Sequence, residues 1–249
     1  YPGADEDVLH DITFTAKPGE TTAIIGSTGS GKSTLVNLIP RFYDVTEGSI
    51  TLDGIDIREI RQHDLREKLG YVPQKGVLFS GTIGSNILFG NQKGSDGEMQ
   101  EAAEIAQAME FIETKPDRFE SSISQGGANV SGGQKQRLSI ARAVAKHPDV
   151  FIFDDSFSAL DYKTDVTLRK ALKEKTENST VLIVAQRIST ILHAEQIIVL
   201  DDGEVAGIGT HRELLRDCEV YRQIAESQLS EQELAETGIN SGKEELTHE

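Results

Sequence analysis

The pattern of apolar and polar positions divides the chain into strand-like runs at both ends and a helical stretch between them. In the N-terminal part, strands are expected over 8–16, 20–26 and 49–53, separated by the turn pairs Pro18-Gly19, Glu47-Gly48 and Asp53-Gly54. The run 35–39 predicts the only helix expected among these strands. Residues 81–146 then follow a helical period, clearest over 98–106, and predict a separate helical lobe.

After this lobe, strands and helices alternate. Strands are expected over 150–154, 181–185, 196–200 and 204–208, with a helix over 162–175. Such alternation is typical of a parallel sheet covered by helices, so the predicted fold class is α/β. We expect an ATP-binding core in two parts, 1–80 and 147–227, an α-helical subdomain over 81–146, and an acidic tail over 228–249. The tail is expected to be mobile or a weakly held helix.

Charge and composition narrow the function classes. The chain of 249 residues carries 25 basic and 41 acidic residues, a net charge of −16, which disfavours nucleic acid or an anionic membrane as a partner. No apolar run approaches the ~20 residues that a membrane span needs, so no direct membrane insertion is expected. The single Cys218 excludes an internal disulfide, and the six histidines, which lack metal-ligand spacing, are expected at the surface.

The strongest chemical signal is a G-x-x-x-x-G-K-[ST] motif directly after the strand-like run 22–25. Its residues are Gly26, Ser27, Thr28, Gly29, Ser30, Gly31, Lys32, Ser33 and Thr34. In such a P-loop, glycines allow backbone N–H groups to converge on phosphate, the lysine reaches the β- and γ-phosphates, and the Ser33 hydroxyl ligates Mg²⁺. The alternative is an accidental glycine-rich turn. Such a turn would not require a strand before it and a helix after it, and the sequence predicts both. The sequence therefore predicts a nucleotide triphosphate site.

Two further segments suit the same chemistry. The apolar run 150–153 ends in Asp154, as expected for a strand beside the P-loop that holds Mg²⁺, although an incidental aspartate after a buried strand would look the same. Ser131, Gly132, Gly133 and Gln134 open a predicted helix, whose N-terminus is a second potential anion site. Because the P-loop already holds one set of phosphates, we expect this second site to serve a nucleotide bound by another subunit. A dimer is therefore the expected working unit.

These motifs together resemble the ATP-binding cassette of exporter-type ABC transporters over nearly the whole chain. The segment 130–134 is similar to the family's signature motif, 153–154 to its Walker B end, Gln74 to the Q-loop glutamine, and 158–161, ending in Asp161, to the D-loop. Tyr1 resembles the aromatic residue that stacks on adenine.

The resemblance implies a P-loop NTPase core with a parallel sheet, an N-terminal antiparallel β subdomain and an inserted α-helical subdomain. It implies that two cassettes enclose two Mg-ATP molecules, each between one P-loop and the opposite signature motif. Ser33, Gln74 and Asp154 would then ligate Mg²⁺, and Asp161 would lie at the nucleotide. It also implies docking of membrane-domain coupling helices on the segment 74–90, whose apolar run 77–83 either forms that surface or packs inward.

Two positions of the expected catalytic site depart from the family pattern. Asp155 stands where a glutamate normally positions or deprotonates the attacking water, and Gln186 stands where the switch histidine is expected. Aspartate is one methylene shorter than glutamate, and a misplacement of about 1 Å can cost ~10²-fold in rate. Glutamine can donate a hydrogen bond but cannot carry a proton. The segment 122–127 also lacks the glutamate and arginine that exporters usually carry there.

These observations predict one cassette of a heterodimeric ABC exporter at the cytoplasmic face of the cell membrane. Its own site, with Asp155, Gln186 and Gln74 as catalytic residues, would hydrolyse ATP slowly, while its signature motif would complete the partner's site. Two alternatives stay open: a self-sufficient homodimeric ATPase and a nucleotide-sensing module that does not hydrolyse ATP.

Overall fold

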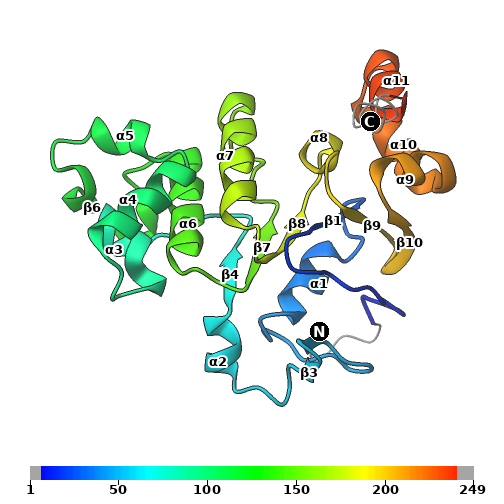
Figure 1. Ribbon diagram of the computed structural model, residues 1–249, viewed down its shortest axis with the longest axis horizontal. Coiled ribbons are helices and arrows are strands. Elements are labelled where there is room, and N and C mark those ends of the chain that lie inside the picture. The colour runs from blue at the N-terminus through cyan, green and yellow to red at the C-terminus, as the bar shows by residue number, and fades with distance from the viewer. Residues whose placement is uncertain (1–6, 240–249) are drawn as a thin grey trace, which may run out of the picture.

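A six-stranded, mostly parallel sheet forms the centre of the computed structural model, which describes residues 7–239 (Figure 1). The strands are β1 (Thr21–Gly26), β4 (Leu69–Val72), β7 (Val150–Asp154), β8 (Thr180–Val184), β9 (Gln196–Asp201) and β10 (Glu204–Gly209). Their order is β10-β9-β1-β8-β7-β4, and only the β9–β10 pair is antiparallel. The predicted α/β fold with its parallel sheet is thus confirmed, although the last strand reverses direction.

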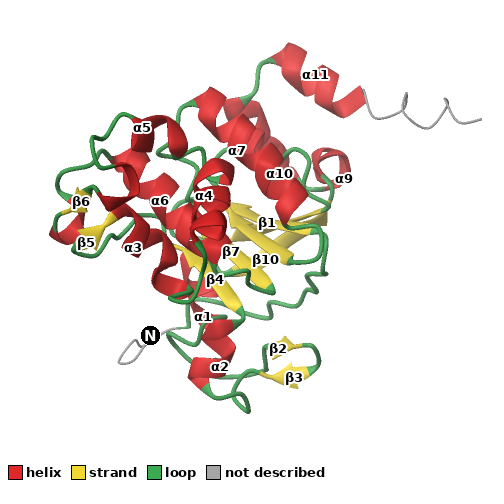
Figure 2. Cartoon of the chain, turned by 60° about the vertical axis from the view of Figure 1, so that its left-hand side comes forward, coloured by secondary structure: helices red, strands yellow, loops and turns green. Residues whose placement is uncertain are grey.

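Both faces of the sheet are buried, which is why its central strands read as continuous apolar runs. On one face, alternate strand residues such as Ile25 and Phe153 form a cluster with helices α6 (Gly132–Ala145), α7 (Tyr162–Lys175) and α10 (Glu219–Gln228). On the other face, Ile24 and Ile152 pack with α1 (Lys32–Leu38) and α2 (Gln62–Glu67). Figure 2 shows these helices on opposite sides of the strands.

The helical lobe predicted over 81–146 is present at the β4 edge of the sheet, where α6 contacts β4. Besides α6 it contains α3 (Ile83–Ile87), α4 (Asp96–Ile105) and α5 (Met109–Glu113), and the 3-10 turns Leu88–Gly90, Arg118–Glu120 and Gln125–Gly127. A short antiparallel pair, β5 (Gly81–Thr82) with β6 (Ser122–Ile123), joins the start of the lobe to the segment before α6. Figure 1 shows this lobe as the green helices on the left.

The N-terminal β part is smaller than the sequence predicts. The antiparallel pair β2 (Thr51–Leu52) and β3 (Ile55–Asp56) is present, but the described part of the expected strand over 8–16 forms no strand. That segment keeps its alternation from Ile12 onward, because Ile12, Phe14 and Ala16 pack half-buried on the α1 side of the core. Asp11 interrupts the extended course with a φ of 47°. The period-2 pattern therefore reflects alternating burial without ladder pairing.

The C-terminal part adds α8 (Ile188–Ile191), α9 (His211–Asp217) and α11 (Glu231–Ile239) to α10. The expectation that all histidines lie at the surface is wrong for His211, which is buried; its ring bonds Tyr221 (2.7 Å) and Thr237 (3.1 Å). Of the acidic tail predicted over 228–249, α11 occupies residues 231–239, and residues 240–249 lie outside the described range. Among residues 7–239, no helix combines the length and apolarity that a membrane crossing requires.

Candidate nucleotide site

The P-loop connects the end of β1 to the start of α1 on the carboxyl edge of the sheet. Gly26 ends β1, and a Cβ there would lie 2.1 Å from the carbonyl oxygen of Leu200, so only glycine fits. Gly31 is the N-cap of α1 with a φ of 95°, a left-handed conformation that favours glycine. Since this cap has no side chain, the first-turn amides of α1 face the loop without a capping oxygen, as a phosphate site requires.

Lys32 lies over the P-loop. Its ammonium donates to the carbonyl oxygens of Gly26 (2.8 Å) and Ser27 (2.6 Å), and to Ser30 Oγ (3.4 Å). Burial lowers the pKa of Lys32, while the nearby carboxylates of Asp155 and Asp154 act in the opposite direction. The three oxygens around Nζ are the kind of acceptors that phosphate oxygens would replace. The residues present therefore fit a nucleotide's phosphate chain.

Ser33 and Asp154 meet beside the loop and offer a pair of hard oxygen ligands. Ser33 Oγ donates to Asp154 Oδ1 at 3.2 Å, and the Tyr71 hydroxyl donates to the other carboxylate oxygen at 3.4 Å. Burial raises the pKa of Asp154, partly offset by these two hydrogen bonds. Hydroxyl and carboxylate oxygens suit Mg²⁺. The end of β7 thus lies beside the P-loop, although β8 separates β7 from β1 in the sheet.

Asp155, Gln74 and Gln186 converge next to this pair, from positions far apart in the chain. Asp155 is buried, follows β7 with a φ of 47°, and donates its backbone N–H to Val184 O at 2.9 Å. Its Oδ2 accepts hydrogen bonds from the amide nitrogens of both Gln74 (3.0 Å) and Gln186 (2.9 Å). Gln74 thus presents its nitrogen here rather than the oxygen that a Mg²⁺ ligand needs, so its metal role stays a prediction.

The signature segment begins α6 and forms a capping box. Ser131 Oγ accepts from the N–H of Gln134 at 3.3 Å, and Gln134 Oε1 accepts from the N–H of Ser131 at 3.1 Å. The spacing S-x-x-Q is itself a capping-box signal, which the sequence reasoning did not use. Because α6 and α1 pack on opposite faces of the sheet, the structure does not bring Ser131–Gln134 to this chain's own P-loop.

Asp161, the predicted D-loop aspartate, is the N-cap of α7. Its carboxylate accepts from the backbone N–H (3.0 Å) and the hydroxyl (2.7 Å) of Thr164, and these bonds lower the pKa of Asp161. The D-loop also lies close to the signature helix, since a Cβ on Gly133 would come within 3.3 Å of the carbonyl oxygen of Ala159. Of the remaining predicted residues, Thr28 and Gly29 lie in the loop, Thr34 lies in α1, and Tyr1 lies outside the described range.

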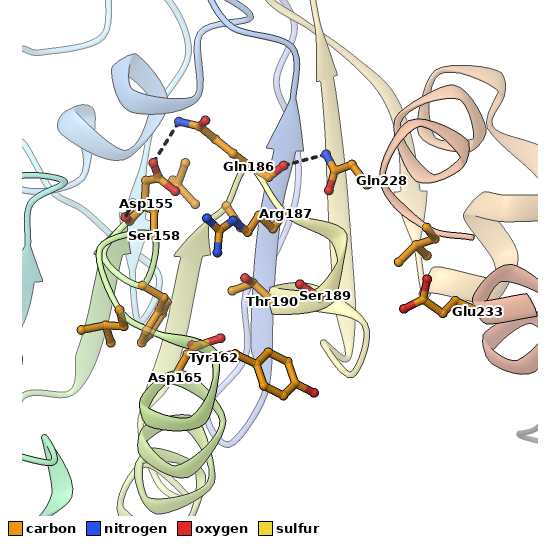
Figure 3. Close-up of a pocket in the computed structure, with 15 residues that line it drawn as sticks. Asp155, Ser158, Tyr162, Asp165, Gln186, Arg187, Ser189, Thr190, Gln228 and Glu233 are labelled. Atoms are coloured by element: carbon orange, nitrogen blue, oxygen red, sulfur yellow. Dashed lines mark hydrogen bonds between the residues drawn. The ribbon is translucent and has the colours of Figure 1, made fainter. Parts of the chain in front are cut away.

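A cleft of about 590 Å³ extends from Asp155 and Gln186 toward the C-terminal helices (Figure 3). Gln228, the last residue of α10, lies on its far side and bonds the backbone at Gln186 and Ile188. The sequence reasoning missed this residue, because its partners lie 42 and 40 positions away and no local pattern links them.

Comparison with known proteins identifies the family. The ABC transporter family model matches residues 9–158. An uncharacterized ABC transporter ATP-binding protein of Mycobacterium tuberculosis is 50% identical over 92% of this chain, and one of Bacillus subtilis is 46% identical over 92%. The chain spans 39% of the length of each of these relatives.

The structural comparison agrees. A bacterial Atm1-family ABC exporter, solved with ATP bound, superposes with a TM-score of 0.88 at 39% identity, covering 91% of this chain and 40% of that one. The assignment to a family rests on two findings. The family model matches more than half of the chain, and the two relatives are 50% and 46% identical to it. The chain belongs to the ABC transporter family, and its fold is that of the family's ATP-binding domain.

Proposed function

We propose that this chain binds Mg-ATP in a cassette pair that drives an exporter from the cytoplasmic face of the cell membrane. In this proposal its own P-loop site hydrolyses ATP slowly. Its signature segment, Ser131–Gln134, completes a faster site on the P-loop of a different partner cassette. ATP at the slow site acts as a long-lived clasp between the two cassettes.

The residues that bind the nucleotide are complete, which supports the first part of the proposal. The P-loop backbone and Lys32 would hold the phosphates, and Ser33 with Asp154 would hold Mg²⁺, which neutralises phosphate charge when bound. Tyr1 would stack on adenine and Asp161 would lie at the nucleotide, as the resemblance implies.

The single observation that carries the proposal of slow hydrolysis is the environment of the Asp155 carboxylate. One of its oxygens accepts from two amides, Gln74 and Gln186, and neither amide can take up a proton. The carboxylate also sits on a side chain one methylene shorter than glutamate. General-base assistance is worth ~10² to 10⁴-fold in rate, so an out-of-reach base accounts for a slow site.

The position of the signature segment supports a second cassette as partner. Ser131 and Gln134 lie at the exposed start of α6, on the face of the sheet opposite the helix that follows the P-loop. A nucleotide enclosed by both motifs would therefore need two chains. Ser131 and Gln134 match the family's signature motif. This segment would therefore contact the nucleotide bound by the partner cassette.

An aromatic surface on the helical lobe supports docking of a transmembrane partner. Phe79 and Phe89 are exposed and stack at 4.4 Å, and the guanidinium of Arg142 lies 5.1 Å from the Phe79 ring. Val77 is exposed beside them, whereas Leu78 and Ile83 are buried. The apolar run 77–83 thus divides between the surface and the core, and its exposed members form a surface for coupling helices.

The test is the ATPase rate of the purified chain and of its Asp155→Glu and Asp155→Glu/Gln186→His variants. We expect slow hydrolysis by the unmodified chain and a gain on the order of 10²-fold in the double variant. Asp117→Glu, the same change on the exposed surface, serves as the control. Fast hydrolysis by the unmodified chain would instead favour the self-sufficient homodimer. Absence of membrane spans upstream of Tyr1 in the parent gene would favour the nucleotide sensor.

A further inference from the structure

Gln228 clamps the loop that carries Gln186. Its Nε2 donates to the carbonyl oxygen of Gln186 at 2.8 Å, and its Oε1 accepts from the N–H of Ile188 at 2.9 Å. One side-chain amide thus satisfies two backbone groups on either side of Arg187, as a neighbouring strand would. Figure 3 shows Gln228 and Asp155 on opposite sides of Gln186.

The clamp acts on the part of the loop that has least other support. Ala185 is buried at the end of β8, and its N–H donates to Ile24 O of β1 at 3.1 Å. Ile188 is fully buried at the start of α8. Between these anchors, Gln186 and Arg187 are exposed, so packing does not fix the carbonyl of Gln186 or the direction of its side chain.

The clamp comes from a well-anchored helix. Tyr221 and Ala225, on the inner face of α10, are fully buried, and the Tyr221 hydroxyl lies 2.7 Å from Nδ1 of His211 in α9. The C-terminal turn closes with the N–H of Leu229 donating to Ala225 O at 2.8 Å. Gln228 therefore presents its amide from a fixed position, although much of its own side chain is exposed.

We propose that Gln228 is a positioning residue: it holds the 186–188 backbone so that the Gln186 amide reaches the Asp155 carboxylate and the reacting end of the nucleotide. The C-terminal helices thereby set the geometry of a catalytic loop whose residues lie 40 to 42 positions earlier in the chain. The clamp itself follows from the hydrogen bonds above; its effect on turnover rests on the proposed role of Gln186.

The clamp is tested first by amide hydrogen exchange of the ATP-free chain, with Gln228→Leu and the isosteric Gln228→Glu. In Gln228→Leu we expect the Ile188 amide to exchange ~3- to 10-fold faster, because its acceptor is lost. Gln228→Glu keeps an acceptor for the Ile188 N–H but places a carboxylate against Gln186 O. The exchange rate of the Ile188 amide should therefore stay closer to that of the unmodified chain. Gln223→Leu, on the exposed side of the same helix, is the control and should leave exchange of the Ile188 amide unchanged. Unchanged exchange at Ile188 in Gln228→Leu, with α10 amides still protected, would overturn the clamp.

The connection to turnover is tested by a double-mutant cycle on single-turnover ATP hydrolysis and ATP affinity. Gln228→Leu should lower the hydrolysis rate ~3- to 10-fold without changing the affinity for ATP, and should add nothing in a Gln186→Ala background. Equal effects of Gln228→Leu with and without Gln186 would overturn the positioning role. If the unmodified chain proves fast, the proposed slow site fails, but the exchange result and the cycle still decide the role of Gln228.

Discussion

The side-chain amide of Gln186 donates a 2.9 Å hydrogen bond to Oδ2 of Asp155, the same oxygen that accepts from Gln74. The three residues expected to take part in hydrolysis are thus hydrogen-bonded to one another through this oxygen. Neither amide can take up a proton, so a proton that Asp155 accepted from water would find no further acceptor in these two side chains.

The first prediction concerns removal of this carboxylate. In an exporter assembled with its partner cassette, Asp155→Asn should change the total ATPase rate by less than about threefold, because turnover takes place at the partner's P-loop. In a self-sufficient ATPase the same change would remove the general base and cost ~10² to 10⁴-fold. Steady-state ATPase measurement distinguishes the two, with the matching substitution in the partner as the positive control.

The second prediction concerns ATP binding. Lys32→Met should weaken ATP binding ~10- to 100-fold, because the charge-assisted hydrogen bonds of Nζ to phosphate are lost while the loop keeps its shape. Calorimetric titration with Mg-ATP measures this loss. Lys17→Met, which removes only an exposed ion pair with Glu20, should bind ATP normally. Equal affinity of Lys32→Met and the unmodified chain would exclude the P-loop as the nucleotide site.

The third prediction concerns pH and Mg²⁺. Burial raises the pKa of Asp154 above its ordinary 3.8, so the carboxylate takes up a proton at a higher pH than an exposed aspartate does. The contribution of Mg²⁺ to ATP affinity should therefore weaken as the pH falls, while the pH still lies above 3.8. Binding measured with Mg²⁺ and with EDTA over this range tests the expectation, and Asp154→Asn should reduce the pH dependence to the part that comes from protonation of the ATP phosphates.

The raised pKa of Asp154 also makes the free energy of unfolding depend on pH. Between the unfolded and folded pKa values of Asp154, the folded chain binds more protons, so the free energy of unfolding contributed by this group falls as the pH rises. At neutral pH the buried charge is destabilising in the nucleotide-free chain. Asp154→Asn should therefore raise the melting temperature there, and a lowered melting temperature would contradict this assignment.

Local signals in the sequence predicted much of the fold. The strand over 150–154 and the helix over 162–175 appear with the predicted bounds, because an apolar run and an N-cap aspartate define them without distant partners. The strand over 8–16 fails, since its alternation is satisfied by packing of Ile12 and Phe14 on the core while Asp11 breaks the extended backbone. Ladder pairing depends on a partner strand that the pattern cannot supply.

In the candidate site, too, residues that follow one another along the chain were predictable, whereas contacts between distant residues were not. The P-loop was predictable because its ligands follow one another along the chain, and Asp154 because it ends a buried strand. The link of Asp155 to Gln74 and Gln186 spans 81 and 31 positions, and the clamp by Gln228 spans 42 and 40. These contacts arise only once strands β4, β7 and β8 lie side by side with α10 packed against the sheet, so no spacing rule could reveal them.

The fourth prediction concerns the aromatic surface of the helical lobe. Phe79→Ala should cost about 1 kcal/mol of stability, through loss of the stack with Phe89 and of the Arg142 contact, and leave the ATPase rate of the purified chain unchanged. In the assembled exporter it should reduce transport per ATP hydrolysed. Ile208→Ala, an exposed apolar residue of β10 at the other edge of the sheet, should affect neither. Full transport by Phe79→Ala would exclude this surface as the coupling site.

The last prediction separates two roles of Ser131. As the N-cap of α6, its hydroxyl accepts from the Gln134 N–H, so Ser131→Ala should destabilise the chain by about 1 kcal/mol, measured by urea unfolding. Asparagine caps a helix as well as serine does, so Ser131→Asn should keep the stability. If the Ser131 hydroxyl also contacts the partner's nucleotide, both variants should slow ATP hydrolysis by the assembled pair, although only Ser131→Ala lowers the stability. Full ATPase activity in Ser131→Asn would instead mean that Ser131 acts only as a helix cap, and the proposed completion of the partner's site would rest on the α6 backbone alone.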